Sequence, residues 1–168
     1  AGGADVLNEE GTIDSQVSAS VDSGFSIVSY AGNSATSATI GHGLNSAPEM
    51  VIIKARNTAE GWATLVAPGG VFAYARFLND SGASASVYYS AFFNSTVPTD
   101  NVFSVAGSSK VNDNFNYIAY CFHSVDGYSK IGSYTGTGAS GNSIVTGFRP
   151  AFVMIKITTA SNSWFIYD

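Results

Sequence analysis

The chain has 168 residues and a formal net charge of −5 at pH 7, with 11 % charged residues against the roughly 25 % of an ordinary globular chain. Its seven Lys and Arg residues are scattered singly and form no basic stripe that could neutralise a phosphate backbone, so we expect no nucleic-acid partner. No apolar run approaches the roughly 20 residues of a membrane helix, and we expect no membrane insertion.

The first 23 residues are polar, and their apolar residues are widely spaced. This composition predicts a connector over residues 1–23 that leads in from an upstream region, with one edge strand around residues 14–21. The chain starts at Ala1 without a signal-peptide pattern, so we expect a fragment or a processed product.

From Gly24 onward, apolar residues alternate or form short runs, which predicts strands and gives little support for a helix. The run at residues 50–53 predicts a strand that is buried on both faces. Turn-forming clusters of Gly, Pro, Asn, Asp and Ser separate the strands. Many short strands at this spacing predict an all-β fold, an antiparallel β-sandwich or a lectin-like jelly roll. The predicted strands cover residues 25–30, 38–40, 49–56, 62–67, 73–78, 87–93, 102–105 and 117–123.

An internal repeat is the most informative feature of the sequence. Ser29-Tyr-Ala-Gly32 reappears as Ser133-Tyr-Thr-Gly136, an offset of 104 residues. Two residues then drop out of a turn, and the offset becomes 102 up to the second Trp. The residues that recur are interpreted as the scaffold of each copy: Tyr30, Pro48, Lys54 and Trp62 in the first, and Tyr134, Pro150, Lys156 and Trp164 in the second.

The repeat predicts a first unit over residues 24–126 and a second, truncated unit over residues 127–168. A half-sandwich leaves apolar faces and sheet edges open. We expect the natural chain to continue beyond residue 168; the alternative is that a partner chain completes the fold. Lys54 and Lys156 are predicted to bury their stems and to keep their ammonium groups in solvent.

The chemically versatile residues do not form a catalytic pattern. The acidic residues sit mostly singly in turns or at strand ends, and Glu49 corresponds to Ala151 in the second copy, whereas a glycosidase needs two facing carboxylates. His42 is interpreted as an exposed residue of a tight turn, and neither His has a metal-binding spacing. Cys121 is interpreted as a small buried hydrophobe rather than a thiol activated by His123. We therefore expect no enzyme, no metal and no cofactor.

Aromatic residues are concentrated in the middle of the chain, and this segment is the best candidate for a contact surface. Neighbouring aromatics on one strand would place rings on both faces, so some rings should lie outside a simple core. Exposed rings could stack on sugars or anchor a protein partner. The alternative is that a second sheet or another subunit covers both faces. The candidate surface comprises Phe72, Tyr74, Tyr88, Tyr89, Phe92 and Phe93.

Several strings occur together in one known family: Gly24-Phe-Ser-Ile-Val-Ser-Tyr30, Ile40-Gly-His-Gly-Leu44, Val51-Ile-Ile-Lys54, Tyr117-Ile-Ala-Tyr-Cys-Phe122, Gly127-Tyr-Ser-Lys-Ile-Gly-Ser-Tyr-Thr-Gly136 and Thr146-Gly-Phe-Arg-Pro-Ala-Phe-Val153. They resemble an uncharacterised β-rich repeat domain of tail-fibre and other virion structural proteins of marine phages, including cyanophages. The resemblance spans almost the whole chain from about Gly2. It implies a virion component in which the second copy is usually complete.

These features predict a phage virion structural protein, a tail fibre or host-adhesion appendage that acts by binding and assembly. Its expected location is the extracellular virion. Its expected partners are further copies of itself in a homo-oligomer such as a trimer, other virion proteins, and a host-surface glycan or protein. Two alternatives stay open: a capsid-decoration or head-fibre protein, and a lectin-like carbohydrate-binding module.

Overall fold

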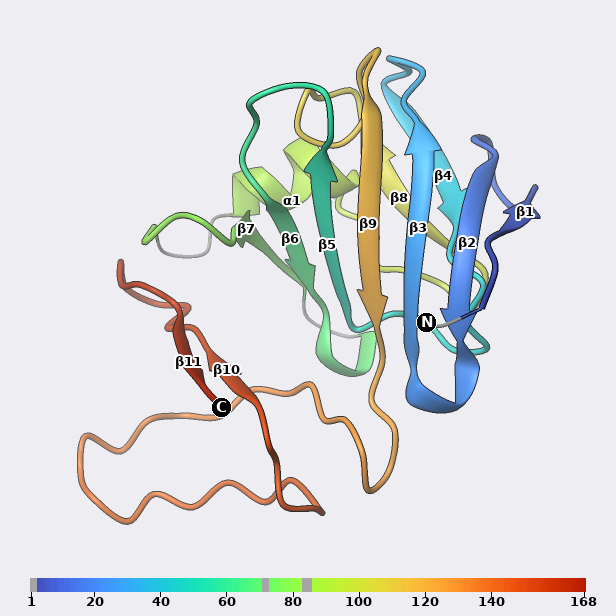
Figure 1. Ribbon diagram of the computed structural model, residues 1–168. Coiled ribbons are helices and arrows are strands. Elements are labelled where there is room, and N and C mark those ends of the chain that lie inside the picture. Colours follow the sequence, from blue (N-terminus) through green and yellow to red (C-terminus); the bar gives the residue numbers. More distant parts are fainter. Residues whose placement is uncertain (1–2, 71–72, 83–85) are drawn as a thin grey trace.

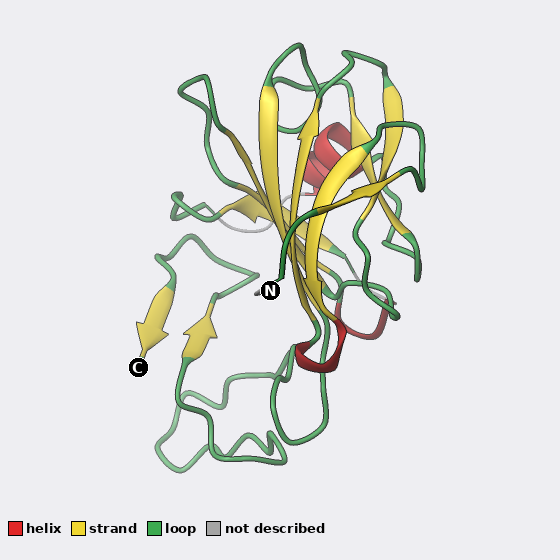
Figure 2. Cartoon of the chain, turned by 45° about the vertical axis from the view of Figure 1, so that its right-hand side comes forward, coloured by secondary structure: helices red, strands yellow, loops and turns green. Residues whose placement is uncertain are grey.

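The computed structural model describes residues 3–70, 73–82 and 86–168 and is built from antiparallel strands and one α-helix (Figures 1 and 2). Its strands are β1 (Val6–Asn8), β2 (Ser15–Ser20), β3 (Phe25–Ala31), β4 (Ser37–Gly41), β5 (Met50–Ala55), β6 (Ala63–Val66), β7 (Tyr74–Phe77), β8 (Val102–Ala106), β9 (Asn116–Phe122), β10 (Val153–Ile155) and β11 (Phe165–Tyr167). The α-helix is α1 (Ser86–Phe93), and short 3-10 turns lie at Val21–Ser23 and Pro68–Gly70.

A seven-stranded antiparallel sheet forms the first layer, in the order β1-β2-β3-β9-β5-β6-β7. Strand β9 lies between β3 and β5 although it follows both in the chain by many residues (Figure 1). The strands are rich in β-branched and aromatic residues, which favour extended backbone. The prediction of an all-β antiparallel sandwich is confirmed.

The N-terminal residues take part in both layers. Strands β1 and β2 extend the large sheet beyond β3, and β2 covers most of the edge strand predicted at residues 14–21. Between them, Gly11 and Ile13 form bridges to Ile40 of β4. The segment expected to be a connector, residues 1–23, therefore supplies two strands to the sandwich.

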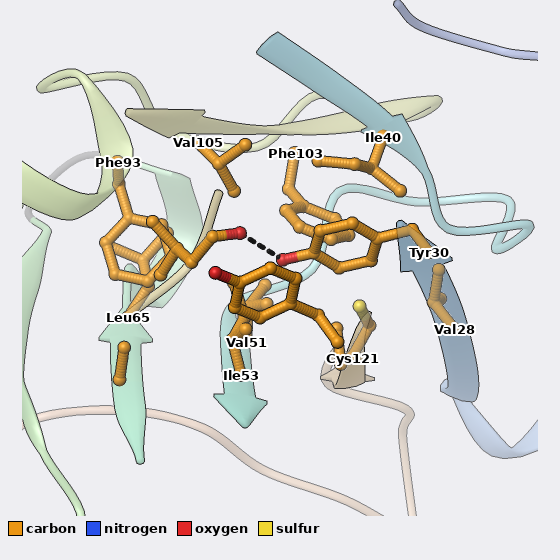
Figure 3. Packing of buried hydrophobic residues seen from close by; sticks show 14 of the residues in the cluster. Val28, Tyr30, Ile40, Val51, Ile53, Leu65, Phe93, Phe103, Val105 and Cys121 are labelled. Carbon is orange, nitrogen blue, oxygen red and sulfur yellow. Dashed lines mark hydrogen bonds between the residues drawn. The ribbon is translucent and has the colours of Figure 1, made fainter. Parts of the chain in front are cut away.

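The second layer consists of the β4–β8 pair and α1, which cover one face of the large sheet (Figure 1). Figure 3 shows the core between the layers, where Val28, Val51 and Ile53 of the large sheet meet Phe103 and Val105 of β8. These five side chains are fully buried. Burial of this apolar area is the main stabilising contribution to the fold.

Residues 87–93 were predicted to form a strand, and this prediction is wrong, because they lie in α1. Tyr88 and Phe92 are four residues apart, and their rings stack at 5.4 Å, as neighbours on one face of a helix do. Tyr89 and Phe93 have the same spacing. Aromatic residues favour strands in general, but here the spacing of four was the signal for a helix.

The second copy of the repeat contains one short hairpin. Strand β10 pairs with β11 through Val153↔Tyr167, Met154↔Ile166 and Ile155↔Phe165. In the first copy, β5 pairs with β6 through Val51↔Leu65, Ile52↔Thr64 and Ile53↔Ala63. Subtracting the sequence offset of 102 from each β10–β11 pair gives the corresponding β5–β6 pair. The two hairpins therefore have the same register.

Candidate contact surface

The aromatic residues predicted to form a contact surface occupy several environments. Phe92 and Phe93 are buried in the core, which corrects their assignment to an exposed surface. The cause is α1, which turns both rings toward the large sheet and β8. Tyr74, Tyr88 and Tyr89 are half-buried, and Phe72 lies outside the described residues.

The rings of this cluster hold α1 against β7. Phe77 of β7 lies 5.5 Å from the Tyr88 ring and 5.3 Å from the Phe92 ring, measured between ring centroids. Tilted and stacked pairs at such distances are favourable aromatic contacts. The sequence left open an alternative in which a second sheet or another subunit covers these aromatic residues. Phe92 and Phe93 fit it in part, because other parts of the same chain cover them.

The structure places a different apolar surface on the outer face of the large sheet, opposite the core. Alternation along each strand directs Val28, Ala119 and Ile53 inward, so the residues beside them point outward. The outer residues Ile27, Tyr120 and Ile52 lie opposite one another on β3, β9 and β5. We call the following half-buried side chains the outer band: Phe25, Ile27, Ile52, Ile118, Tyr120 and Phe122.

Aromatic stacking organises one end of the outer band. The rings of Phe25 and Phe122, opposite each other on β3 and β9, stack with centroids 4.7 Å apart. Met50 of β5 lies opposite Phe122 in the same row. Paired rings on a sheet face shield one another and also present a broad apolar platform to a ligand or a partner.

A polar concavity of about 240 Å³ adjoins the other end of the outer band. It lies where β2 begins, β3 ends, β9 begins and β5 ends. Its polar lining has a carboxylate, a guanidinium, two amides and a hydroxyl, which supply both hydrogen-bond donors and acceptors. The side chains that carry these groups are Asp14, Gln16, Ser29, Arg56 and Asn116.

The side chains of these five residues do not hold the fold together. Within the part of the chain that the structure describes, they make no side-chain hydrogen bond and no ion pair to another residue. In contrast, the two tyrosines beneath them are fixed: Tyr30 Oη donates to Val111 O at 2.7 Å, and Tyr117 Oη donates to Ser109 O at 2.9 Å. The concavity thus combines a rigid floor with free hydrogen-bonding groups.

A second concavity, of about 280 Å³, lies between Glu49, Gly69 and Ser124. The Glu49 carboxylate accepts hydrogen bonds from the backbone N–H groups of Gly69 and Ser124, each at 2.7 Å. Burial raises the pKa of this carboxyl, but the hydrogen bonds outweigh burial and leave the pKa below its ordinary value. Glu49 therefore ties two loops together as a carboxylate.

His42 and Cys121 are both buried. The exposed turn residue expected at His42 is a wrong prediction: its Nε2 lies 3.0 Å from Thr99 O, and its Nδ1 accepts the Leu44 N–H at 3.1 Å. These partners fix the neutral tautomer with hydrogen on Nε2. Cys121 is a buried hydrophobe as predicted, and burial raises the pKa of its thiol to about 12.

The scaffold residues of the two copies share sequence positions but not environments. Tyr30 and Pro48 are buried in the first copy, whereas Tyr134 and Pro150 are exposed in the second. The core that encloses Tyr30 includes the stacked ring of Tyr117, 5.2 Å away. Among the described residues of the second copy, no such core forms around Tyr134.

The lysines and tryptophans of the scaffold hold loops. Lys54 Nζ donates to the carbonyl oxygens of Ala55 and Thr58, and Lys156 Nζ donates to those of Ser81 and Asn162. Both ammonium groups thus bind backbone carbonyls; the hydrogen bonds of Lys156 are exposed to solvent, whereas those of Lys54 are partly buried. The tryptophans differ: the backbone N–H of Trp62 donates to Asn79 Oδ1, whereas Trp164 uses its ring.

Trp164 fastens the second copy to the first. Its indole Nε1 donates to Phe77 O at 3.3 Å, and the guanidinium of Arg76 lies 5.5 Å from the centre of its ring. Arg76 also donates to Ile157 O at 3.4 Å. Burial lowers the pKa of Arg76, which stays charged and forms a cation–π contact.

The described residues contain no group of three His, Cys, Asp or Glu side chains that could hold a metal ion. In the same part of the chain, no helix is long and apolar enough to cross a membrane.

The sequence matches the family described as Domain of unknown function (DUF7483) over residues 1–168. The chain belongs to this family. No curated protein and no solved structure shows a significant match. The family description names no activity, ligand or partner, so the function has to be inferred from the residues of the chain itself.

Proposed function

We propose that this DUF7483 chain is a structural module of a phage virion, a tail fibre or a similar host-adhesion appendage, that acts by binding and assembly. The observation that carries the binding role is the outer band with the polar concavity beside it. The resemblance of the sequence strings to phage virion proteins supports the location in the particle. The low charge of the chain is compatible with close contacts between subunits.

The outer band offers a surface that a partner can cover without refolding of the module. Its side chains project from three neighbouring central strands, which hold them in fixed positions. Rigid aromatic anchors cost little conformational entropy on binding and dominate many interfaces. A partner that covers Tyr120 and Ile52 therefore gains apolar burial from a surface that is already formed.

The polar concavity supports a second candidate, a lectin-like module that binds a host glycan. A sugar ring has an apolar face and a rim of hydroxyl groups. Asn116 lies four residues along β9 from Tyr120, about 13 Å, so a glycan of several sugars is the ligand that fits: Tyr120 offers its ring to one sugar, and Asp14, Gln16 and Asn116 offer donors and acceptors to the hydroxyl groups of another. A virion adhesion role and a glycan-binding role agree with each other if the glycan is the receptor.

Location in the particle tests the virion proposal. An antibody raised against the chain should label purified particles of the encoding phage in electron microscopy, and peptides of the chain should appear in their mass spectra. Labelling of the tail supports the fibre, and labelling of the shell supports the capsid-decoration or head-fibre alternative. Particles without the chain would overturn both.

A glycan array tests the binding role. Wild-type chain should bind a defined set of sugars, and Asn116→Ala and Tyr120→Ala should each weaken binding about tenfold, equivalent to about 1.4 kcal/mol. Tyr128→Ala is the matched control, because Tyr128 is exposed on a loop outside the outer band. Equal loss in the control, or no sugar binding by the wild type, would remove the glycan as the ligand.

A further inference from the structure

The two charged side chains of the polar concavity lie on opposite sides of it. Asp14 precedes β2 on one side, and Arg56 follows β5 on the other. Strands β3 and β9 lie between β2 and β5, so three strand spacings, about 14 Å, separate the two backbone positions. In the part of the chain that the structure describes, no ion pair joins the two side chains. The concavity therefore presents a negative group and a positive group to a ligand from opposite sides.

The space between these charges exists because the outward residues at the end of β3 are small. Ser29 pairs with Gln16 of β2, and Ala31 pairs with Asn116 of β9, so short side chains lie between longer ones. The volume of about 240 Å³ is below the roughly 300–1,000 Å³ of sites for drug-sized ligands. The concavity therefore suits one sugar unit of a longer glycan.

Arg56 has a guanidinium that is free for a ligand, unlike two nearby lysines. Lys54, two residues earlier in the chain, binds two backbone carbonyl groups, and Lys110 forms an ion pair with Glu60 at 2.7 Å. Arg56 is exposed, and its guanidinium makes no hydrogen bond or ion pair among the described residues. A guanidinium offers only donors and binds a carboxylate through two parallel hydrogen bonds. Arg56 therefore favours an anionic group on the ligand.

Asp14 determines which way round such a ligand lies. A carboxylate accepts hydrogen bonds from hydroxyl groups and repels a second carboxylate at short range. A hexuronic acid carries its carboxylate on one side of the sugar ring and hydroxyl groups on the other. It satisfies both sides of the concavity when the carboxylate faces Arg56 and the hydroxyl groups face Asp14. A neutral hexose lacks the group that Arg56 binds.

We infer that the polar concavity is a subsite for a hexuronic acid unit of an acidic glycan, with the carboxylate on Arg56 and hydroxyl groups on Asp14. This inference rests on the glycan-binding candidate proposed above and specifies its class of sugar. Gln16 and Asn116 bind further hydroxyl groups, and Tyr120 stacks on a neighbouring sugar. The net charge of −5 disfavours anions in general, so a preference for an acidic glycan has to come from a local cation.

Titration of the 168-residue chain with paired tetrasaccharides tests the inference. Each pair consists of a fluorescently labelled tetramer of one hexuronic acid and its carboxyl-reduced form, a neutral hexose tetramer with the same linkages. The panel contains tetramers of glucuronic, galacturonic and mannuronic acid. In at least one pair, the acidic tetramer should bind about tenfold more tightly than its reduced form. This preference should shrink when NaCl rises from about 0.05 M to about 0.5 M, because ions screen exposed charges.

Three variants assign the preference to a residue. Arg56→Gln should abolish it, so that the acidic tetramer binds no more tightly than the reduced one. Arg149→Gln is the matched control, because Arg149 is exposed, carries the same charge and lies outside the concavity. It should keep the preference of the wild type. Gln16→Ala should weaken both members of a pair by the same factor, since an uncharged amide binds hydroxyl groups that both members have.

The outcomes separate this inference from the glycan-binding candidate. Equal binding of the acidic and the reduced tetramers overturns the inference and leaves a glycan-binding module in place, whereas binding of no sugar at all overturns both. Loss of the preference in Arg149→Gln as well as in Arg56→Gln also overturns the inference, because general charge attraction then explains it. Tighter binding of a sulfated hexose tetramer than of every hexuronic acid tetramer overturns the assignment to a carboxylate.

Discussion

Single side chains in this fold owe their roles to their surroundings. Tyr30 donates to Val111 O from within the core, whereas Tyr134, its counterpart in the repeat, is half exposed. His42 accepts one backbone hydrogen bond and lies within hydrogen-bonding distance of a backbone carbonyl in a place where solvent does not reach. A buried polar side chain of this kind fixes the path of the loops around it, because breaking either bond leaves an unpaired buried group.

The stability of the chain should depend on the protonation of His42. Burial holds the pKa of His42 below its ordinary value of 6.5. The unfolded state therefore takes up a proton at a higher pH than the folded state, and stability falls as the pH drops below about 6.5. Chemical denaturation should give a lower unfolding free energy at pH 5 than at pH 7.

His42→Asn supplies the control for this pH dependence. An amide can still accept the Leu44 N–H but does not titrate. The variant loses the Thr99 contact, so its unfolding free energy at pH 7 should be about 1 kcal/mol lower than that of the wild type. Between pH 7 and pH 5, its unfolding free energy should then change less than that of the wild type. Glu49 contributes little to the change between pH 7 and pH 5, because its pKa in the folded chain lies below the ordinary value of 4.5. Equal slopes for wild type and variant would contradict the assignment to His42.

At the scale of the element, β5 shows how a strand serves two surfaces. Its inner residues pack in the core, and its outer residues belong to the outer band. The prediction of burial on both faces at residues 50–53 fits Met50, Val51 and Ile53, but Ile52 is half-buried. Helix α1 has a sequence with high strand propensity, yet it forms a helix that packs against β7 and β8 in the second layer.

Neighbouring isoleucines on β5 allow a matched test of the two faces. Ile53→Ala removes a fully buried side chain and should lower the unfolding free energy by about 2–5 kcal/mol. Ile52→Ala makes the same chemical change on the outer band and should cost roughly 1 kcal/mol, because that side chain is already in partial contact with water. Urea denaturation measures both, and equal losses would show that the outer band is covered.

At the scale of the whole molecule, the chain consists of a two-layer sandwich and a small hairpin, β10–β11, whose Trp164 bonds to Phe77 of β7 (Figure 1). Among the described residues, the polar contacts of this attachment are the indole of Trp164 with Phe77 O and the Arg76 guanidinium, the Arg76 hydrogen bond to Ile157 O, and hydrogen bonds from Lys156 and Asn162 to Ser81 O. Because the hairpin lacks a buried core of its own, we expect this junction to open at a lower free energy than the sandwich.

Trp164→Ala should loosen this attachment and leave the sandwich intact. Loss of the indole hydrogen bond and the cation–π contact costs on the order of 1–2 kcal/mol, so open forms should increase roughly tenfold. Limited proteolysis at residues 127–150 should accelerate accordingly, while the melting temperature of the sandwich stays the same. Tyr134→Ala is the control, and equal acceleration by both variants would contradict the role of Trp164.

The sequence by itself determined the all-β class, the place of most strands and the burial of Cys121, because alternation and turn residues are local properties. It also carried the offset that relates the two hairpins. The spacing of four among the aromatics of α1 was a signal for the helix in the sequence, whereas only the tertiary structure decided the burial of Phe93 and His42 and the strand β1. Each of these depends on packing against residues far away in the chain, such as β8 for Phe93 and Thr99 for His42. The outer band emerged for the same reason, since β9 joins β3 and β5 only in the folded sheet.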